Sequence, residues 1–130
     1  MPIKSHQTLS DLKAHTITRE KQGTLLSKGA TLTPTSTGAI TVTDSYHLVA
    51  VASGDTDNLQ TINSTKTAVA GQIVVLQAAA DDKTIVVKNY SSAPDNIRIG
   101  ADVTLDDATD SITLVWSGSS WNAIAVHRPG

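Results

Sequence analysis

Aspartate supplies 11 of the 12 side-chain carboxylates in this 130-residue sequence. Glutamate occurs once, at Glu20, so an acid and base pair of carboxylates would have to come from aspartates alone. The aspartates gather at 55–57, 81–82 and 106–110, where turns are expected. Because an aspartate carboxylate accepts hydrogen bonds from nearby backbone N–H groups, we interpret these groups as turn residues. A calcium site at 102–110 is the weaker alternative, since that segment lacks a glycine-centred ligand spacing.

Histidine, serine and glycine motifs indicate no other reaction centre. The histidines, at positions 6, 15, 47 and 127, show neither HxxH nor HxxxH spacing, and cysteine is absent. A zinc site would require one histidine from each protomer at a symmetry axis. His47 follows Tyr46 in a predicted strand, so we interpret it as a surface or interface imidazole. With no GxSxG, GxGxxG or Walker motif, we expect no catalytic residue, no metal, no cofactor and no enzyme activity.

Two tryptophans flank a four-residue Ser-Gly-Ser-Ser turn at 117–120. Exposed tryptophans can stack on a sugar, but a position beside a tight turn favours a cross-strand aromatic pair that closes a hairpin. Side chains on one face of a strand recur every two residues, which sets the expected register. The predicted opposite pairs are Trp116 with Trp121, Leu114 with Ala123, and Ile112 with Ala125.

The other face of this hairpin is too apolar to be left in water. The same alternation places Val115 on it together with Thr113, Ile124 and Val126. The chain has two Trp, two Tyr and no Phe, so one protomer supplies few large side chains to cover this face. We therefore predict an oligomer interface that includes Val115, Ile124 and Val126.

Composition predicts the fold class. Val, Ile and Thr make up 39 of the 130 residues, and β-branched side chains suit a pleated sheet. Short runs of this kind alternate with turn residues from position 39 onward. We expect an all-β head of short antiparallel strands, arranged as a sandwich, barrel or prism, preceded by an extended N-terminal arm. The predicted strands are 39–43, 46–53, 59–62, 72–77, 83–88, 96–99, 111–116 and 121–126.

The chain divides near Pro34 and the Ser/Thr run that follows it. We predict an extended anchoring arm over 1–37 and a β-rich head over 38–130. Residues 1–43 carry a net charge of +3 and residues 44–130 a net charge of −5, so the arm is expected to meet an acidic surface. The predicted capsid- or partner-binding residues are Ile3, Lys4, Leu9, Leu12, Lys13, Ile17, Arg19 and Lys21.

Nucleic acid and membranes are not expected partners. The basic residues of the arm are spread out and have no aromatic residues between them, which makes a poor nucleic-acid footprint. The first twenty residues lack an apolar signal-peptide core, and no apolar run approaches the roughly 20 residues of a membrane span.

The order of blocks from Gly38 to Ala125 resembles a module common in tailed-phage virion proteins. The blocks are ITVT at 40–43, DNLQTIN at 57–63, GQIVVLQAA at 71–79, KTIVVK at 83–88, NIRI at 96–99, VTLDD at 103–107 and DSITLVWSGSSW at 110–121. The chain departs from the pattern at Asn122-Ala123, where the family often has an acidic and an aromatic residue, and at 91–95, where SSAPD replaces a glycine-rich turn.

The resemblance implies a small virion component, usually a homotrimer, without catalytic residues. Because the chain leaves no length for a fibre shaft, we expect a capsid decoration (cement) or short head-fibre protein. Its arm would bind the major capsid protein and stabilise the shell. It would be made in the host cytoplasm and would lie on the capsid exterior. The alternative is a tail or baseplate component that binds a receptor or carbohydrate.

Overall fold

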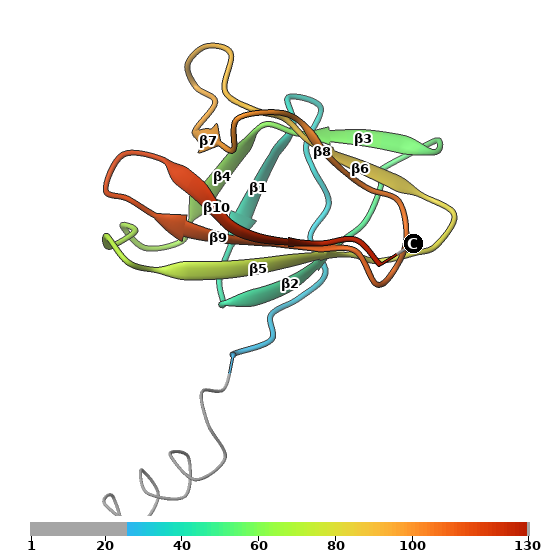
Figure 1. Cartoon of the computed structure of the whole chain (residues 1–130), viewed down its shortest axis with the longest axis horizontal. Coiled ribbons are helices and arrows are strands. Elements are labelled where there is room, and N and C mark those ends of the chain that lie inside the picture. Colours follow the sequence, from blue (N-terminus) through green and yellow to red (C-terminus); the bar gives the residue numbers. More distant parts are fainter. Residues whose placement is uncertain (1–25, 130) are drawn as a thin grey trace, which may run out of the picture.

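The computed structural model describes residues 26–129, which form ten β-strands and no helix (Figure 1). The all-β class predicted from composition is therefore confirmed. Over these residues no apolar helix of membrane-spanning length is found. The strands are β1 (Ala39–Val42), β2 (Tyr46–Val49), β3 (Thr56–Leu59), β4 (Thr61–Ser64), β5 (Ile73–Ala78), β6 (Thr84–Val87), β7 (Ile97–Arg98), β8 (Val103–Leu105), β9 (Ser111–Trp116) and β10 (Trp121–His127).

The first six strands pass through the three sheets twice in the same order. β1, β2 and β3 pair in parallel with β4, β5 and β6, each pair in a different sheet. β8 and β9 then pair antiparallel with β6 and β5, and β10 pairs antiparallel with β9 and in parallel with β7. The sheets are thus β2-β5-β9-β10-β7, β3-β6-β8 and β1-β4 (Figure 1). Antiparallel pairing, expected from the sequence, is joined by four parallel pairs.

Side chains from all three sheets meet in one apolar core. Alternate residues of β5, β6 and β9 are buried, as expected for strands with one face toward a core. Trp121 is the one aromatic residue among the fifteen buried apolar side chains, so aliphatic packing dominates, at about 1.5–3 kcal/mol for each fully buried large side chain. The core comprises Ile40, Val42, Val49, Leu59, Ile62, Val74, Leu76, Ala78, Ile85, Val87, Ile97, Leu105, Ile112, Leu114 and Trp121.

The predicted strand at 59–62 is wrong in its extent. The chain forms two strands there, β3 and β4, which meet at Gln60 and enter different sheets. The turn expected at 55–57 is also wrong in part: Thr56 and Asp57 begin β3, because Thr56 to Leu59 pair with β6. Strand β8 was not predicted either. Its three residues are held by pairing with β6, and so short a run carries little periodic signal in the sequence.

The segment that enters β1 lies beside the edge of β2. Lys28 bridges Tyr46 and Leu32 bridges Val49, both in parallel. The Gly29 N–H donates to the Tyr46 carbonyl and the Leu32 N–H to the Leu48 carbonyl, each at 2.8 Å. The described part of the predicted arm is therefore hydrogen-bonded to the head.

His47 is fully buried beneath this segment, so its assignment as a surface or interface imidazole is wrong. Its Nε2 accepts the backbone N–H groups of Thr43 and Asp44, each at 3.1 Å. Its Nδ1 lies 2.7 Å from the Ala30 carbonyl and donates to it, since the other ring nitrogen acts as acceptor. The imidazole thus joins the β1–β2 turn to the segment before β1.

Candidate partner-binding surface

The five-stranded sheet has one face on the core and one face directed outward. In β5 and β9 the core takes every second residue, so the intervening residues lie on the outer face. Direct cross-strand pairs on this face are Ile73 with Val115 and Val75 with Thr113. None of the six outward positions on these two strands carries a charged side chain. They are Ile73, Val75, Gln77, Ser111, Thr113 and Val115.

The predicted hairpin register is confirmed near the turn and is wrong further along. Trp116 lies opposite Trp121 and Leu114 opposite Ala123, as expected. A β-bulge between Ala123 and Ala125 then adds one residue to β10, so Ile112 faces Val126 and not Ala125. One extra residue transfers every later side chain to the opposite face of the strand.

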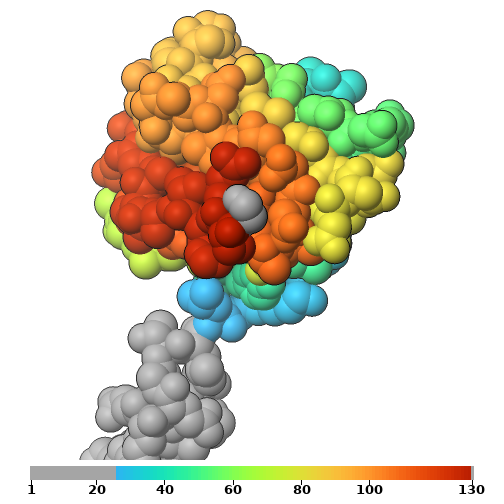
Figure 2. Space-filling view, turned by 45° about the vertical axis from the view of Figure 1, so that its right-hand side comes forward, coloured from blue at the N-terminus to red at the C-terminus, as the bar shows by residue number. Residues whose placement is uncertain are grey.

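Val115, Ile124 and Val126, predicted as oligomer-interface residues, all belong to β9 and β10. Val115 is half-buried on the outer face and Ile124 at the bulge is 57% exposed. Val126 is 46% exposed but lies opposite core-facing Ile112, so its predicted place on the same face as Val115 is wrong. Ile73, which lies opposite Val115, is exposed as well, at 41%. Figure 2 shows β10 in red at the surface, next to orange residues of the preceding segment. Large apolar side chains therefore remain uncovered on β5 and β10, and such surfaces are typical of interaction sites.

The tryptophans form the cross-strand pair that the sequence predicted. Their ring centroids are 5.4 Å apart and their planes are inclined at 54°. Trp121 is 1% exposed and its Nε1 donates to the Ile62 carbonyl at 3.3 Å. Trp116 is half-buried and borders a shallow groove of about 220 Å³. Trp116, and not the buried Trp121, is thus the ring available to a ligand in this groove.

The grouped aspartates lie in turns and loops except for Asp57, which lies in β3, so its assignment as a turn residue is wrong. Lys83 Nζ donates to Asp55 Oδ1 at 2.9 Å, and this hydrogen bond, followed by the lysine charge, lowers the pKa of Asp55. The side-chain and backbone donors of Thr109 lower the pKa of Asp107. Among residues 26–129 no cluster of three His, Cys, Asp or Glu side chains is arranged to hold a metal ion.

Buried Asp110 holds the loop between β8 and β9. Its Oδ2 accepts the Asp106 backbone N–H at 3.0 Å and lies 3.7 Å from Arg128 Nε. The Ala78 N–H donates to the Asp110 carbonyl at 3.0 Å, which ties the loop to the end of β5. These contacts give Asp110 a structural role in the loop.

The eight predicted arm residues lie outside the described part of the chain, so their roles stay predictions. Sequence reasoning missed two features of the head: the burial of His47 and an apolar hollow among the loops that follow β2 and β5. Both depend on segments 17 or more residues apart, such as Ala30 and His47. The alternating run YHLVAVA around His47 was the one local signal, because it places His47 in phase with buried Val49.

The family model of the phage depolymerase C-terminal beta sandwich domain matches residues 33–122. No curated protein and no solved structure gives a significant match. The matched span includes β1 to β9 and the hairpin turn. It indicates a tail-fibre-type β module of a virion-associated phage protein, and it supports the tail alternative better than capsid decoration. Since the match covers well over half of the sequence, the chain belongs to the family of phage depolymerase C-terminal beta-sandwich domains.

Proposed function

We propose that the protein is a structural component of a phage tail fibre or tailspike, and that it works by assembly and not by catalysis. The observation that carries this proposal is the family match over residues 33–122. The titratable groups of the head support a non-catalytic role, because Asp55, Asp107 and Asp110 are engaged in turns and loop contacts.

The outer face of β5, β9 and β10 is the proposed contact with further copies of the chain. Ile73, Val115 and Ile124 offer apolar area, and the outward positions of β5 and β9 are uncharged. A partner on this face must therefore be neutral and apolar, and a second copy presents the same surface. A homotrimer is the expected form: around a three-fold axis each copy would place one part of this face against a different part of the next copy, which closes the ring.

Capsid decoration is the second candidate. It is favoured by the positive charge of residues 1–43, which suits an acidic partner such as the major capsid protein. In that case the arm residues named above bind the shell.

Receptor or carbohydrate binding by a tail component would use the groove beside Trp116.

Labelling of intact virions tests the location. Antibodies against the head are coupled to gold particles and imaged on phage by electron microscopy. We expect the gold on the tail or baseplate. Gold on the shell would establish capsid decoration in its place, and virions without gold would overturn both candidates.

The absence of catalysis is tested separately on purified protein. Capsular polysaccharide of the host is incubated with it, and the size of the polysaccharide is followed by gel filtration. We expect no change in size. Shortening of the chains would overturn the non-catalytic part of the proposal while leaving the tail location open to its own test.

A further inference from the structure

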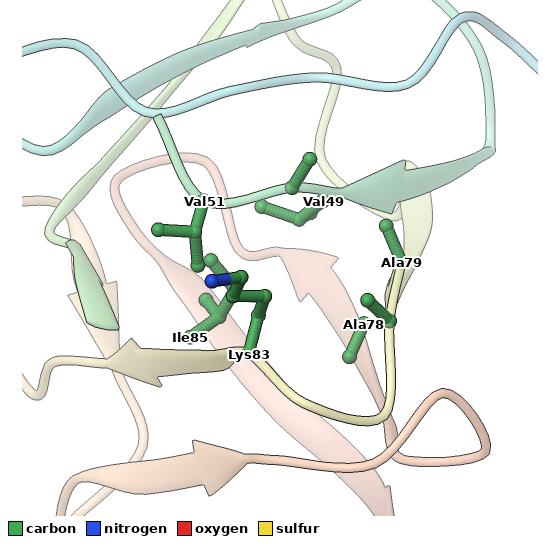
Figure 3. Close-up of a pocket in the computed structure, with 8 residues that line it drawn as sticks. Val49, Val51, Ala78, Ala79, Lys83 and Ile85 are labelled. Carbon is green, nitrogen blue, oxygen red and sulfur yellow. The ribbon is translucent and has the colours of Figure 1, made fainter. Parts of the chain in front are cut away.

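A small apolar hollow opens at one end of the head. Figure 3 shows Val49, Val51, Ala78, Ala79 and Ile85 around it, with the Lys83 side chain extending along one side. Its volume is about 100 Å³. Pockets for drug-sized molecules measure roughly 300–1,000 Å³, so this hollow suits one aliphatic side chain of a protein partner.

The loops around the hollow are acidic. Asp81 and Asp82 lie directly between two lining residues, Ala80 and Lys83, and both are exposed. Lys83 Nζ is already engaged, since it donates to Asp55 at 2.9 Å and to the Gly54 carbonyl at 3.0 Å.

Further carboxylates join this end of the head through loop contacts. Asp57 Oδ2 accepts the Ala52 N–H at 2.8 Å, and Asp81 Oδ1 accepts the Ala108 N–H at 2.9 Å. The second bond joins the loop that carries Asp106 and Asp107 to the loop that carries Asp81, and Asp106 itself lies 3.5 Å from Arg128 Nη2. A partner that inserts an aliphatic side chain here should therefore carry positive charge next to it.

The N-terminal segment of this chain has the required composition. Residues 1–25 contain four basic and two acidic residues, whereas residues 26–129 contain six basic and ten acidic residues. Aliphatic and basic residues are adjacent in Ile3-Lys4 and Leu12-Lys13, and Ile17 lies two positions before Arg19. The segment and the head thus have opposite net charge, and the segment supplies aliphatic side chains beside cations.

The direction of the chain favours binding of this segment to the hollow of a second copy over binding to the hollow of its own head. The segment before β1 runs parallel to β2, with Lys28 at Tyr46 and Leu32 at Val49. Leu26 therefore lies toward the start of β2, while the hollow lies beyond its end, at Val49 and Val51. The first described residue, Leu26, is thus at the opposite end of β2 from the hollow of its own head.

We propose that residues 1–25 of one copy bind a neighbouring copy by placing an aliphatic side chain in this hollow and cations against its acidic loops. The contact is head-to-tail, so it closes into a ring or continues as a filament, according to the rotation between copies. It uses a different surface from the outer face of β5, β9 and β10. It also does not depend on where the protein lies in the virion.

Disulfide trapping tests the contact in the full chain, which has no cysteine of its own. Three donor variants, Ile3→Cys, Leu12→Cys and Ile17→Cys, are each mixed with an Ala80→Cys acceptor that carries a larger tag. Ser119→Cys, exposed in the turn between β9 and β10, is the control acceptor. We expect at least one donor to give mixed-size dimers tenfold faster with Ala80→Cys than with Ser119→Cys. Equal rates for all three donors would overturn the proposal.

Two further experiments test whether the partner is a second copy and whether the acidic loops contribute to the contact. When donor and acceptor cysteines are placed in one chain at low concentration, a predominant internal disulfide would overturn docking onto a second copy.

In the acceptor, Asp81→Asn with Asp82→Asn should slow trapping at least threefold at low salt, while Asp95→Asn near β7 should leave the rate unchanged. An unchanged rate in the double variant would overturn the role of the acidic loops. Trapping should persist with Ile73→Asp, which separates this contact from the outer-face contact.

Discussion

Asn96 and Ile62 are joined by two reciprocal hydrogen bonds. Asn96 Oδ1 accepts the Ile62 N–H at 2.9 Å, and Asn96 Nδ2 donates to the Ile62 carbonyl at 2.8 Å. The side-chain amide thus pairs with β4 as a neighbouring strand would, although Asn96 directly precedes β7 in another sheet. The Trp121 N–H donates to the Asn96 carbonyl at 2.8 Å, so this residue links β4, β7 and β10.

Asn96→Ala is expected to lower the free energy of unfolding by about 2–4 kcal/mol, because it removes two hydrogen bonds and leaves the Ile62 N–H without its partner. Urea denaturation measures the change. Asn63→Ala, at an exposed position in β4, is the matched control and should stay within about 0.5 kcal/mol of the parent. Similar losses in both variants would show that the Asn96 contacts have no special role.

Gly29→Ala is expected to separate the segment before β1 from β2. A Cβ at this position would clash with His47 Cε1 and would lie 2.6 Å from Asp44 Oδ2, and the buried imidazole is held in place by its hydrogen bonds on both ring nitrogens. The amide hydrogens of Leu32 and Ala50, which bond across this edge, should exchange at least tenfold faster. Ala30→Ser, at an exposed position, should leave both exchange rates unchanged. Unchanged protection in Gly29→Ala would contradict the tight contact.

Stability is expected to fall at acid pH. The Lys88 ammonium, and then the Asn89 N–H, hydrogen-bond to Asp102 and lower its pKa below the ordinary value, and hydrogen bonds from Ser27 and Thr43 do the same for the pKa of Asp44. Carboxyl groups with a lowered folded-state pKa stabilise the fold above their unfolded pKa. That contribution is lost as the pH falls through the folded pKa, progressively below about pH 5.

Thermal denaturation between pH 3 and pH 7 measures this dependence. Asp102→Asn should reduce the difference in melting temperature between pH 3 and pH 7, because the titrating group is gone. Asp82→Asn, at an exposed carboxyl group, is the control. A pH dependence in Asp102→Asn as steep as that of the parent would rule out the assigned contribution.

Ile73→Asp is expected to weaken self-association at least tenfold, because it places a charge on the apolar outer face opposite Val115. Val69→Asp is the control, since Val69 is 71% exposed in the loop between β4 and β5. Sedimentation equilibrium measures the dissociation constants, and urea denaturation checks that both variants remain folded. An equal effect of the two substitutions would place the self-association elsewhere.

The two tryptophans should respond differently to truncation. Trp121→Ala is expected to cost about 3–5 kcal/mol of stability, because it empties a core site and removes a hydrogen bond to Ile62. Trp116→Ala should cost less, since that ring is only half-buried. Glycan-array binding that is lost in folded Trp116→Ala would support a carbohydrate site in the groove, whereas binding that survives this change would exclude stacking on Trp116.

Local sequence determined most of the strands, the turn positions of most grouped aspartates and the hairpin closed by Trp116 and Trp121. These features depend on steric preferences of β-branched residues, on side-chain hydrogen bonds within turns and on the two-residue period of a strand. Those interactions act over a few residues, so they can be read without knowledge of the partner strands.

Tertiary structure alone decided the parallel pairs of β1, β2 and β3, the bulge in β10 and the burial of His47. Strand partners here lie more than 20 residues apart, as for Ala39 and Thr61, and their register depends on which side chains fit a shared core. The hollow with its acidic loops likewise needs β2, β5 and β6 to be brought together. Packing over such sequence separations leaves little local pattern, which is why the sequence could indicate the outer face with Val115 and Ile124 but not the hollow.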